Sequence, residues 1–388
     1  MAQVTPYFAP VEGGVERHVL ELSLQLRKKG HSVDVYTSNE TRTSERLRAY
    51  SEVRGIPVYR FRSLLSLGEF GKFWPGFVPE ILERDYDVIH AHGYRHPHTD
   101  IAAAVSKLKN VRSVMTAHSP FHPSGVRGPL AEALVPIYDR FVAPVTLRAF
   151  DKVVSLTPAE AKRLILLGVP KDRVVEISHG VGPENFIRIY SSRFLSSVGL
   201  DPEDDLVLYL GRINRTKGID VLIDAFAQVS SKAPSARLVV AGPATSSEEV
   251  AYLSVLRARA GALGIANKVI FTGRLSEEEK LEAYEACRFL VLPSLYEPFG
   301  IVLLEAAAHA KPVVSTLTDG PKTIVKDAST GILVRVGDVG GLARAMERLL
   351  EDDGLVETMS ANALEMARQH SWEMVATQVE QAYLSVQN

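Results

Sequence analysis

The stretch DLVLYLGRINRTKGIDVLIDAFAQVS, residues 205–230, sets the pattern that the rest of the chain repeats. Its apolar run LVLYL predicts a strand that is buried on both faces. A turn bounded by Gly211 and Gly218 follows, and residues 219–230 carry apolar side chains at helical spacing. A buried strand, a glycine turn and a helix in this order are typical of a parallel sheet covered by helices.

The same alternation runs through both halves of the 388-residue chain. Residues 15–30 predict a helix that ends on a basic run and a glycine. Further strands are predicted at 32–38, 55–61, 86–92, 111–118, 151–157, 236–242, 268–273, 288–294 and 311–316, and further helices at 250–263, 276–287 and 301–310. The fold class is therefore α/β, with two doubly wound parallel sheets.

The length exceeds what one hydrophobic core usually organises, so two domains are expected. We place them at residues 1–180 and 181–370, with a C-terminal helix, 371–388, packing back on the first domain. Residues 179–205 are rich in Gly, Pro and Ser, which predicts an inter-domain linker and an exposed segment.

Composition narrows the class of protein. With 46% hydrophobic and 23% charged residues the chain is expected to be globular, and its single cysteine, Cys287, excludes an intramolecular disulfide. No signal peptide or apolar membrane span is evident, so the cytoplasm is the expected location. Residues 1–180 carry a net charge of +5 and the remainder −7, so the first half could face an anionic acceptor or a membrane surface, or simply be solvated. No nucleic-acid partner is expected.

Two stretches in the second half carry chemistry. In GRINRTKG, Arg212 and Lys217 flank a glycine turn before a helix, which suits a diphosphate but also an ordinary solvated turn. In EPFGIVLLE, Glu297 precedes the predicted helix, and if that helix starts near Phe299, Glu305 faces inward about two turns along. A carboxylate among apolar neighbours needs a partner, because unpaired buried charge is costly.

The ordered pairing of these stretches, about 80 residues apart, resembles the retaining glycosyltransferases of family 4. The likeness covers nearly the whole chain and includes TPYFAPVEGGVERHV, DVIHAHGY, TAHS, VVSLTPAEAKRL, ISHGV, VVAG, FTGRLSEEE and HSWEMVATQVEQAYL. It implies the GT-B fold, in which two Rossmann-like domains face each other across a cleft and the second binds most of a nucleotide-sugar donor.

The resemblance also implies roles for individual residues. Those expected to act directly in transfer are His118, Glu297, Arg212 and Lys217, with the two cations on the diphosphate and Glu297 near the transferred sugar. Those expected to bind the donor are Gly13 and Gly14 over the phosphates, Gly273 and Arg274 by the base, the amides of Phe299, Gly300 and Ile301, and Glu305 on the ribose. No metal or other cofactor is expected, and no catalytic base is assigned.

Three departures from the family pattern stand out. Where a glycine pair and a glutamate are usual, this chain has Asp319, Gly320, Pro321 and Lys322. His179 begins HGVG where Asn-Gly-Val-Asp is usual. Only MAQV precedes TPYF, which predicts a displaced start or a shortened first strand.

Three segments each allow both a structural and a functional interpretation. The four histidines of HAHGYRHPH, residues 90–98, suggest a metal site, although a strand-end loop at the cleft wall fits better. The aromatic run 69–77 and the amphipathic segment 126–150 suit either core packing or contact with lipid or acceptor.

The predicted function is transfer of a hexosyl unit from a UDP- or GDP-linked sugar to a hydroxyl, with an α-bond formed. The acceptor is a sugar, a lipid-linked molecule or a small alcohol, and peripheral membrane contact is an alternative to a purely cytoplasmic enzyme. A sugar-nucleotide 2-epimerase and a non-catalytic nucleotide-sugar binding protein remain as alternatives. A dehydrogenase is disfavoured, because neither half opens with GxGxxG.

Overall fold

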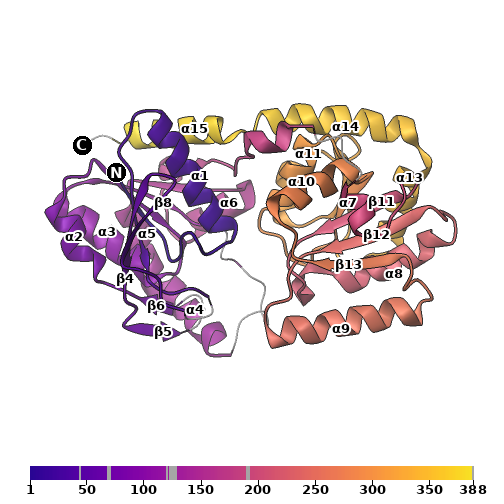
Figure 1. Cartoon of the computed structure of the whole chain (residues 1–388). Coiled ribbons are helices and arrows are strands. Elements are labelled where there is room, and N and C mark those ends of the chain that lie inside the picture. Colours follow the sequence, from indigo (N-terminus) through magenta and orange to yellow (C-terminus); the bar gives the residue numbers. More distant parts are fainter. Residues whose placement is uncertain (43–44, 68–70, 119–120, 122–128, 189–192, 387–388) are drawn as a thin grey trace. The chain divides into compact units, whose positions relative to one another are not determined.

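The computed structural model describes residues 1–42, 45–67, 71–118, 121, 129–188 and 193–386. The chain divides into two compact units (Figure 1). The first unit contains Met1–Gly180 and Trp372–Asn388, and the second contains Val181–Ser371. The chain thus leaves the first unit once and returns to it with its last helix.

The first unit is built on an eight-stranded sheet in the order β10-β9-β8-β7-β1-β2-β4-β3, parallel except for β3 against β4. The first strand, β1, spans three residues and lies at the centre of the sheet, paired with β2 and β7. The strands are β1 Ala2–Val4, β2 Asp34–Ser38, β3 Tyr50–Val53, β4 Ile56–Phe61, β7 Val88–His92, β8 Arg112–Thr116, β9 Lys152–Ser155 and β10 Val174–Glu176, with a separate hairpin of β5 Leu65–Leu67 and β6 Gly71–Phe73. The five strands predicted in this half are confirmed.

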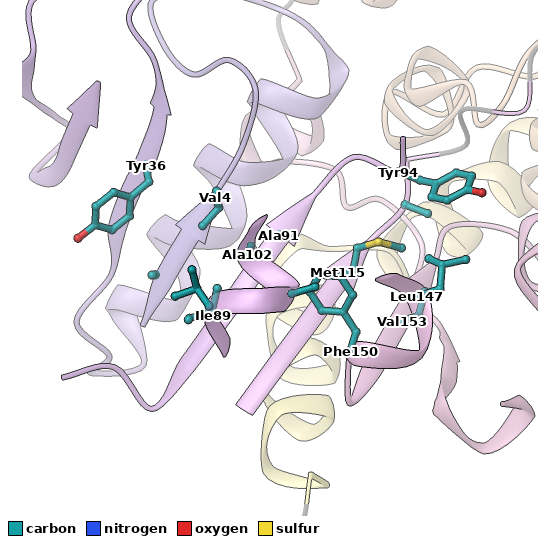
Figure 2. Packing of buried hydrophobic residues seen from close by; sticks show 14 of the residues in the cluster. Val4, Tyr36, Ile89, Ala91, Tyr94, Ala102, Met115, Leu147, Phe150 and Val153 are labelled. Carbon is teal, nitrogen blue, oxygen red and sulfur yellow. The ribbon is translucent and has the colours of Figure 1, made fainter. Parts of the chain in front are cut away.

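Helices cover both faces of this sheet, as its almost uninterrupted buried strands require. They are α1 Gly14–Lys28, α2 Phe77–Glu83, α3 Pro97–Lys109, α4 Pro129–Phe141, α5 Ala143–Ala149, α6 Pro158–Leu166 and α15 Trp372–Leu384, with a 3-10 turn η1 at Lys171–Arg173. On one face Ile89, Met115, Val153, Leu147 and Phe150 belong to one apolar cluster, in which Met115, Leu147, Phe150 and Val153 lie close together (Figure 2). On the other face α1 and α15 cover the sheet together in a single apolar cluster.

The second unit has a six-stranded, wholly parallel sheet in the order β13-β12-β11-β14-β15-β16. Its strands are β11 Asp205–Leu210, β12 Ala236–Ala241, β13 Val269–Gly273, β14 Phe289–Leu292, β15 Val313–Thr316 and β16 Gly331–Val334. Its helices are α7 Arg193–Ser197, α8 Ile219–Ser230, α9 Ser247–Ala262, α10 Glu277–Ala286, α11 Ile301–Ala308, α12 Asp319–Ile324, α13 Val339–Glu351 and α14 Asp353–Arg368, with 3-10 turns η2 Pro183–Phe186 and η3 Arg215–Lys217. The strand and helix order predicted for this half is confirmed.

The direction in which strands are added reverses once in each sheet. In the second unit β12 and β13 extend one side of β11, and β14 begins the other side. In the first unit the reversal lies between β1 and β7. Ligands of open α/β sheets bind outside the carboxyl ends of the strands at such a reversal. The turns after β11 and β14 are therefore the first place to look for a site.

The prediction of an exposed linker over residues 179–205 is wrong for much of that segment. The chain crosses between the units at 180–181, but Phe194 and Leu200 are buried and α7 packs against α10. These two apolar side chains anchor a segment whose polar composition had indicated exposure. Residues 189–192 lie outside the described residues.

Core packing, one of the two interpretations given for residues 69–77 and 126–150, is confirmed for part of each segment. Trp74 and Phe77 are fully buried in the first unit, so these two aromatic residues belong to the core, whereas Phe73 is exposed; residues 68–70 lie outside the described residues. Helices α4 and α5 bury Ala143 and Leu147 yet expose Ile137 and Phe141, and residues 122–128 lie outside the described part. None of the described helices is long and apolar enough to cross a bilayer.

Candidate functional site

The turn after β11 is shaped by close backbone packing in the second unit. Gly218 has a positive φ of 63°, and a Cβ there would stand 2.3 Å from the carbonyl oxygen of Pro293. The amide of Leu295 donates to the carbonyl of Thr216 at 2.8 Å. A glycine is thus required at 218 for two reasons, and the turns after β11 and β14 are held together by backbone contacts.

This packing brings Lys217 and Glu297 into direct contact. Lys217 Nζ donates to Glu297 Oε2 at 2.7 Å, and the hydroxyl of Ser294 reaches the same oxygen at 3.3 Å. Both charged side chains are mostly buried, so water screens the pair less than at a surface. Arg212, which precedes Lys217 in the same turn, is exposed, and its carbonyl accepts a hydrogen bond from the Tyr209 hydroxyl at 2.9 Å. Burial, followed by the charge of Glu297, raises the pKa of Tyr209 well above its usual value.

The helix predicted at residues 301–310 is confirmed as α11, Ile301–Ala308, and it begins two residues after Phe299. Helix α11 starts at Ile301, because Gly300 adopts a positive φ of 91° and caps it. Phe299 therefore precedes the helix, and Glu305 lies little more than one turn inside it rather than two. The Leu303 amide donates to the Gly300 carbonyl at 2.9 Å, whereas the amides of Ile301 and Val302 have no acceptor within the helix, so this end can receive an anion or hydroxyl groups.

Glu305 is buried, and the partner that its burial requires comes from α10. The Tyr284 hydroxyl donates to Oε2 at 2.8 Å, and Lys280 Nζ donates to Oε1 at 3.3 Å. These two residues were not predicted to belong to the site. Their spacing of four residues, which places both on one helix face, was the available signal.

Neighbouring turns add the remaining predicted residues of the second unit. The Gly242 amide donates to the carbonyl of Gly273 at 2.8 Å, which places the turn after β13, with exposed Arg274, next to the turn after β12. On the other side, the Gly320 amide donates to the carbonyl of Glu297 at 3.0 Å, and a Cβ at Gly320 would lie 2.2 Å from the Phe299 carbonyl oxygen. The LTDGPKTIV departure thus packs directly on the EPFG turn.

The first unit carries the other three predicted residues. Gly13 and Gly14 stand at the start of α1, where Gly13 has an extended backbone and caps the helix. His118 follows β8 with a positive φ of 57°, a conformation that costs energy for a residue with a Cβ. Its Nε2 is 3.0 Å from Nδ1 of His92. Burial lowers the pKa of His118 well below its usual value, so the ring is neutral at pH 7.

The histidines of HAHGYRHPH are individually buried in the first unit. Burial lowers the pKa of His90 and His98 to about 3 and of His96 to about 4. Within the described residues, none of them joins a group with metal-ligand geometry; that group consists of His18, His118 and His179 instead. The interpretation of residues 90–98 as a metal site is therefore wrong.

Solved structures share this pair of Rossmann-like units. Sucrose-phosphate synthase from Thermosynechococcus elongatus gives a TM-score of 0.79 at 23% identity, covering 99% of this chain and 98% of that chain. Anabaena Alr3699/HepE in complex with UDP-glucose gives 0.76 at 22% identity, covering 99% and 100%. The architecture is the GT-B fold.

Sequence comparisons identify the family within this fold. Residues 12–185 match the model described as Glycosyltransferase Family 4, and residues 192–366 match Glycosyl transferases group 1. D-inositol 3-phosphate glycosyltransferase from Nocardioides sp. is 31% identical over 96% of this chain and 85% of its own length. The chain belongs to glycosyltransferase family 4. It is a retaining glycosyltransferase that uses a nucleotide sugar as donor, as the motifs predicted.

Proposed function

We propose that this enzyme transfers a hexosyl unit from a UDP- or GDP-linked sugar to a hydroxyl group, retaining the anomeric configuration and forming an α-glycosidic bond without a metal. The observation that carries the proposal is the Lys217–Glu297 pair beside the N-terminus of α11, at the strand reversal of the second unit. A cation, a carboxylate and a helix end together suit a diphosphate joined to a polyhydroxylated ring.

The diphosphate is assigned to Arg212 and Lys217. As the bond to the sugar breaks, negative charge grows on the leaving phosphate oxygen, and fixed cations stabilise that charge. Lys217 is already held in place by Glu297, so little reorganisation accompanies the reaction. These side chains would supply the stabilisation that a divalent metal gives elsewhere.

The nucleoside is assigned to Glu305 with Gly273 and Arg274. Glu305 is held in position by Lys280 and Tyr284, and a carboxylate accepts hydrogen bonds from hydroxyl groups. The two ribose hydroxyls are the groups proposed to donate to it. Exposed Arg274 follows β13 and offers a planar guanidinium that can stack on a base.

The transferred sugar is assigned to Glu297 and the amides of Phe299, Gly300 and Ile301. From the first unit, Gly13 and Gly14 are proposed to approach the phosphates, and neutral His118 to hydrogen-bond the sugar. Neutrality suits this role, because a neutral imidazole both donates and accepts. No protein nucleophile is assigned.

The acceptor is proposed to be a sugar, a lipid-linked molecule or a small alcohol, bound in the cytoplasm. The relative from Nocardioides is named for D-inositol 3-phosphate, which supports a cyclic polyol among the acceptors to test. Ile137, Phe141 and Val145 are more than half exposed on α4 and α5, which supports peripheral contact with a lipid surface. UDP-glucose bound to Anabaena HepE supports a UDP-linked donor.

The proposal is tested by incubating the protein with UDP- and GDP-linked hexoses, with and without an acceptor panel that includes inositol phosphate. We expect acceptor-dependent release of nucleoside diphosphate in the presence of EDTA, and an α-linked product by NMR. Conversion of the donor sugar to its 2-epimer would indicate the epimerase instead. A β-linked product, or binding without turnover across the panel, would contradict the proposal.

A further inference from the structure

Three imidazoles from distant parts of the sequence meet in the first unit. His18 comes from α1, His118 follows β8, and His179 follows β10. One ring nitrogen from each lies within 4.8 Å of the other two. His18 and His179 are buried, whereas His118 is partly exposed. The group lies within one unit and is distinct from the second-unit residues assigned to the nucleotide.

The hydrogen bonds around His118 determine which of its nitrogens carries a lone pair. Gln3 donates through Nε2 to the Tyr383 hydroxyl, so its Oε1 accepts from His92 Nε2 at 2.7 Å. His92 then has a bare Nδ1, which accepts from His118 Nε2 at 3.0 Å. His118 Nδ1 is consequently unprotonated, and it has no hydrogen-bond partner among the described residues.

The rings of His18 and His179 meet edge to face, with centroids 4.8 Å apart, and leave one nitrogen of His18 unsatisfied among the described residues. His18 Nδ1 and His179 Nδ1 are 2.9 Å apart, so one of them donates its proton to the other. His18 Nε2 is buried and also lacks a hydrogen-bond partner among the described residues. A buried polar atom without a partner is costly, and each such atom requires an explanation.

We propose that His18, His118 and His179 form a zinc site with three imidazole ligands and a fourth position open. Neutral imidazole is a common ligand for Zn²⁺, and open zinc sites use three protein ligands. With Zn–N bonds of about 2.0–2.1 Å, tetrahedral nitrogens lie roughly 3.4 Å apart. One nitrogen from each of the three rings lies within 4.8 Å of the other two, so the rings are close enough to converge on a single ion.

The surroundings provide the outer shell that metal-bound histidines use. His118 donates a hydrogen bond from Nε2 to Nδ1 of His92, and His92 donates in turn from its own Nε2 to Gln3 Oε1. The Trp372 ring packs against His18 and His179, with centroids 5.2 and 6.2 Å away, and restricts both. His179 stands where the family pattern has asparagine, so the third ligand is a feature of this chain.

Binding of the ion does not depend on the proposed transfer, which uses no metal. It does involve His118, which is assigned to the donor sugar. Zn²⁺ is therefore expected to inhibit turnover, because a His118 ring bound to the ion cannot hydrogen-bond the donor sugar.

The site is tested by dialysing the EDTA-treated whole chain against Zn²⁺, measuring bound metal by elemental analysis, and titrating Co²⁺ as a visible probe. We expect about one ion per chain, the absorption bands of a four- or five-coordinate Co²⁺ centre, and a melting temperature raised by several degrees with Zn²⁺. The variant His179→Asn should lose the Co²⁺ bands and bind Zn²⁺ at least about tenfold more weakly.

His31→Asn is the matched control, because His31 lies near the surface against Glu380 and outside the cluster. It should bind metal as the wild type does. Circular dichroism of the metal-free variants separates loss of binding from loss of folding. Octahedral Co²⁺ spectra, sub-stoichiometric zinc in the wild type, or unchanged binding by folded His179→Asn would each overturn the proposal.

Discussion

Lys217 Nζ lies 2.7 Å from Glu297 Oε2, and the two residues are 80 positions apart in the chain. One follows β11 and the other follows β14, the two strands on either side of the reversal in the second sheet. The pair therefore joins the two stretches to which the sequence had assigned separate tasks, diphosphate binding and sugar binding. Each charge orients the other before a donor arrives.

Glu297→Gln should lower kcat about 100-fold while leaving nucleoside diphosphate affinity unchanged or stronger. The amide retains a hydrogen-bonding group near Ser294 but no longer neutralises Lys217, which then faces the diphosphate alone. Steady-state kinetics and calorimetric titration with UDP and GDP measure the two quantities. Glu365→Gln, an exposed position on α14, is the control. A wild-type kcat for Glu297→Gln would remove that residue from the sugar site.

Glu305→Gln should raise the donor KM about tenfold or more and change kcat little. Contacts to the ribose exist equally in the ground and transition states, and their loss appears in KM. Tyr284→Phe, which removes the hydroxyl that donates to Glu305, should shift KM in the same direction by less. If the donor KM of a folded Glu305→Gln enzyme stays at the wild-type value, the ribose assignment is wrong.

Gly218→Ala should destabilise the second unit by more than Gly264→Ala does. Both glycines have positive φ, 63° and 72°, so both substitutions carry backbone strain of about 1 kcal/mol. A Cβ at 218 would also meet the Pro293 carbonyl, whereas nothing lies within 4 Å of a Cβ at 264. Urea unfolding should show an extra loss of about 1–3 kcal/mol for Gly218→Ala. Equal losses would show that the two turns are not closely packed.

Acidification should weaken the first unit before the second. His90 and His98 have a pKa of about 3 when folded, because burial disfavours their charged form, and about 6.5 when unfolded. Below pH 6.5 the unfolded chain takes up protons that the folded unit does not, so stability falls as pH falls towards 3. Each such residue contributes up to about 1.4 kcal/mol per pH unit.

Hydrogen exchange at pH 7 and pH 5, corrected for intrinsic rates, measures this effect. Amides of β7 and β8 should lose more protection than those of β11 and β12. Equal changes in the two units would contradict the assignment of the pH dependence to the buried histidines.

The order of strands and helices could be predicted because it depends on local patterns. Buried parallel strands are short apolar runs, and the helices between them have apolar residues at helical spacing. The short strands β3, β10 and β16 were not predicted, and residues 193–200 were predicted wrongly, because two apolar side chains in a polar segment carry too little periodicity to indicate a buried helix.

The contacts within the candidate site could be predicted from the sequence only in part. The motifs gave Lys217 and Glu297 separately, but their contact depends on strand order, which local patterns do not contain. The start of α11 depends on the positive φ of Gly300, and the partners of Glu305 lie on another helix. The three-histidine cluster combines residues 18, 118 and 179, so only the folded sheet brings it together.

Turnover by Lys217→Ala tests the donor site most directly. Released nucleoside diphosphate is measured for the wild type, for Lys217→Ala and for Lys232→Ala, an exposed lysine paired with Glu347. If Lys217 stabilises the leaving diphosphate, kcat/KM should fall about 100- to 1,000-fold for Lys217→Ala, while Lys232→Ala stays at the wild-type value. A folded Lys217→Ala enzyme with wild-type kcat/KM would contradict the assignment of the donor phosphates to the turn after β11.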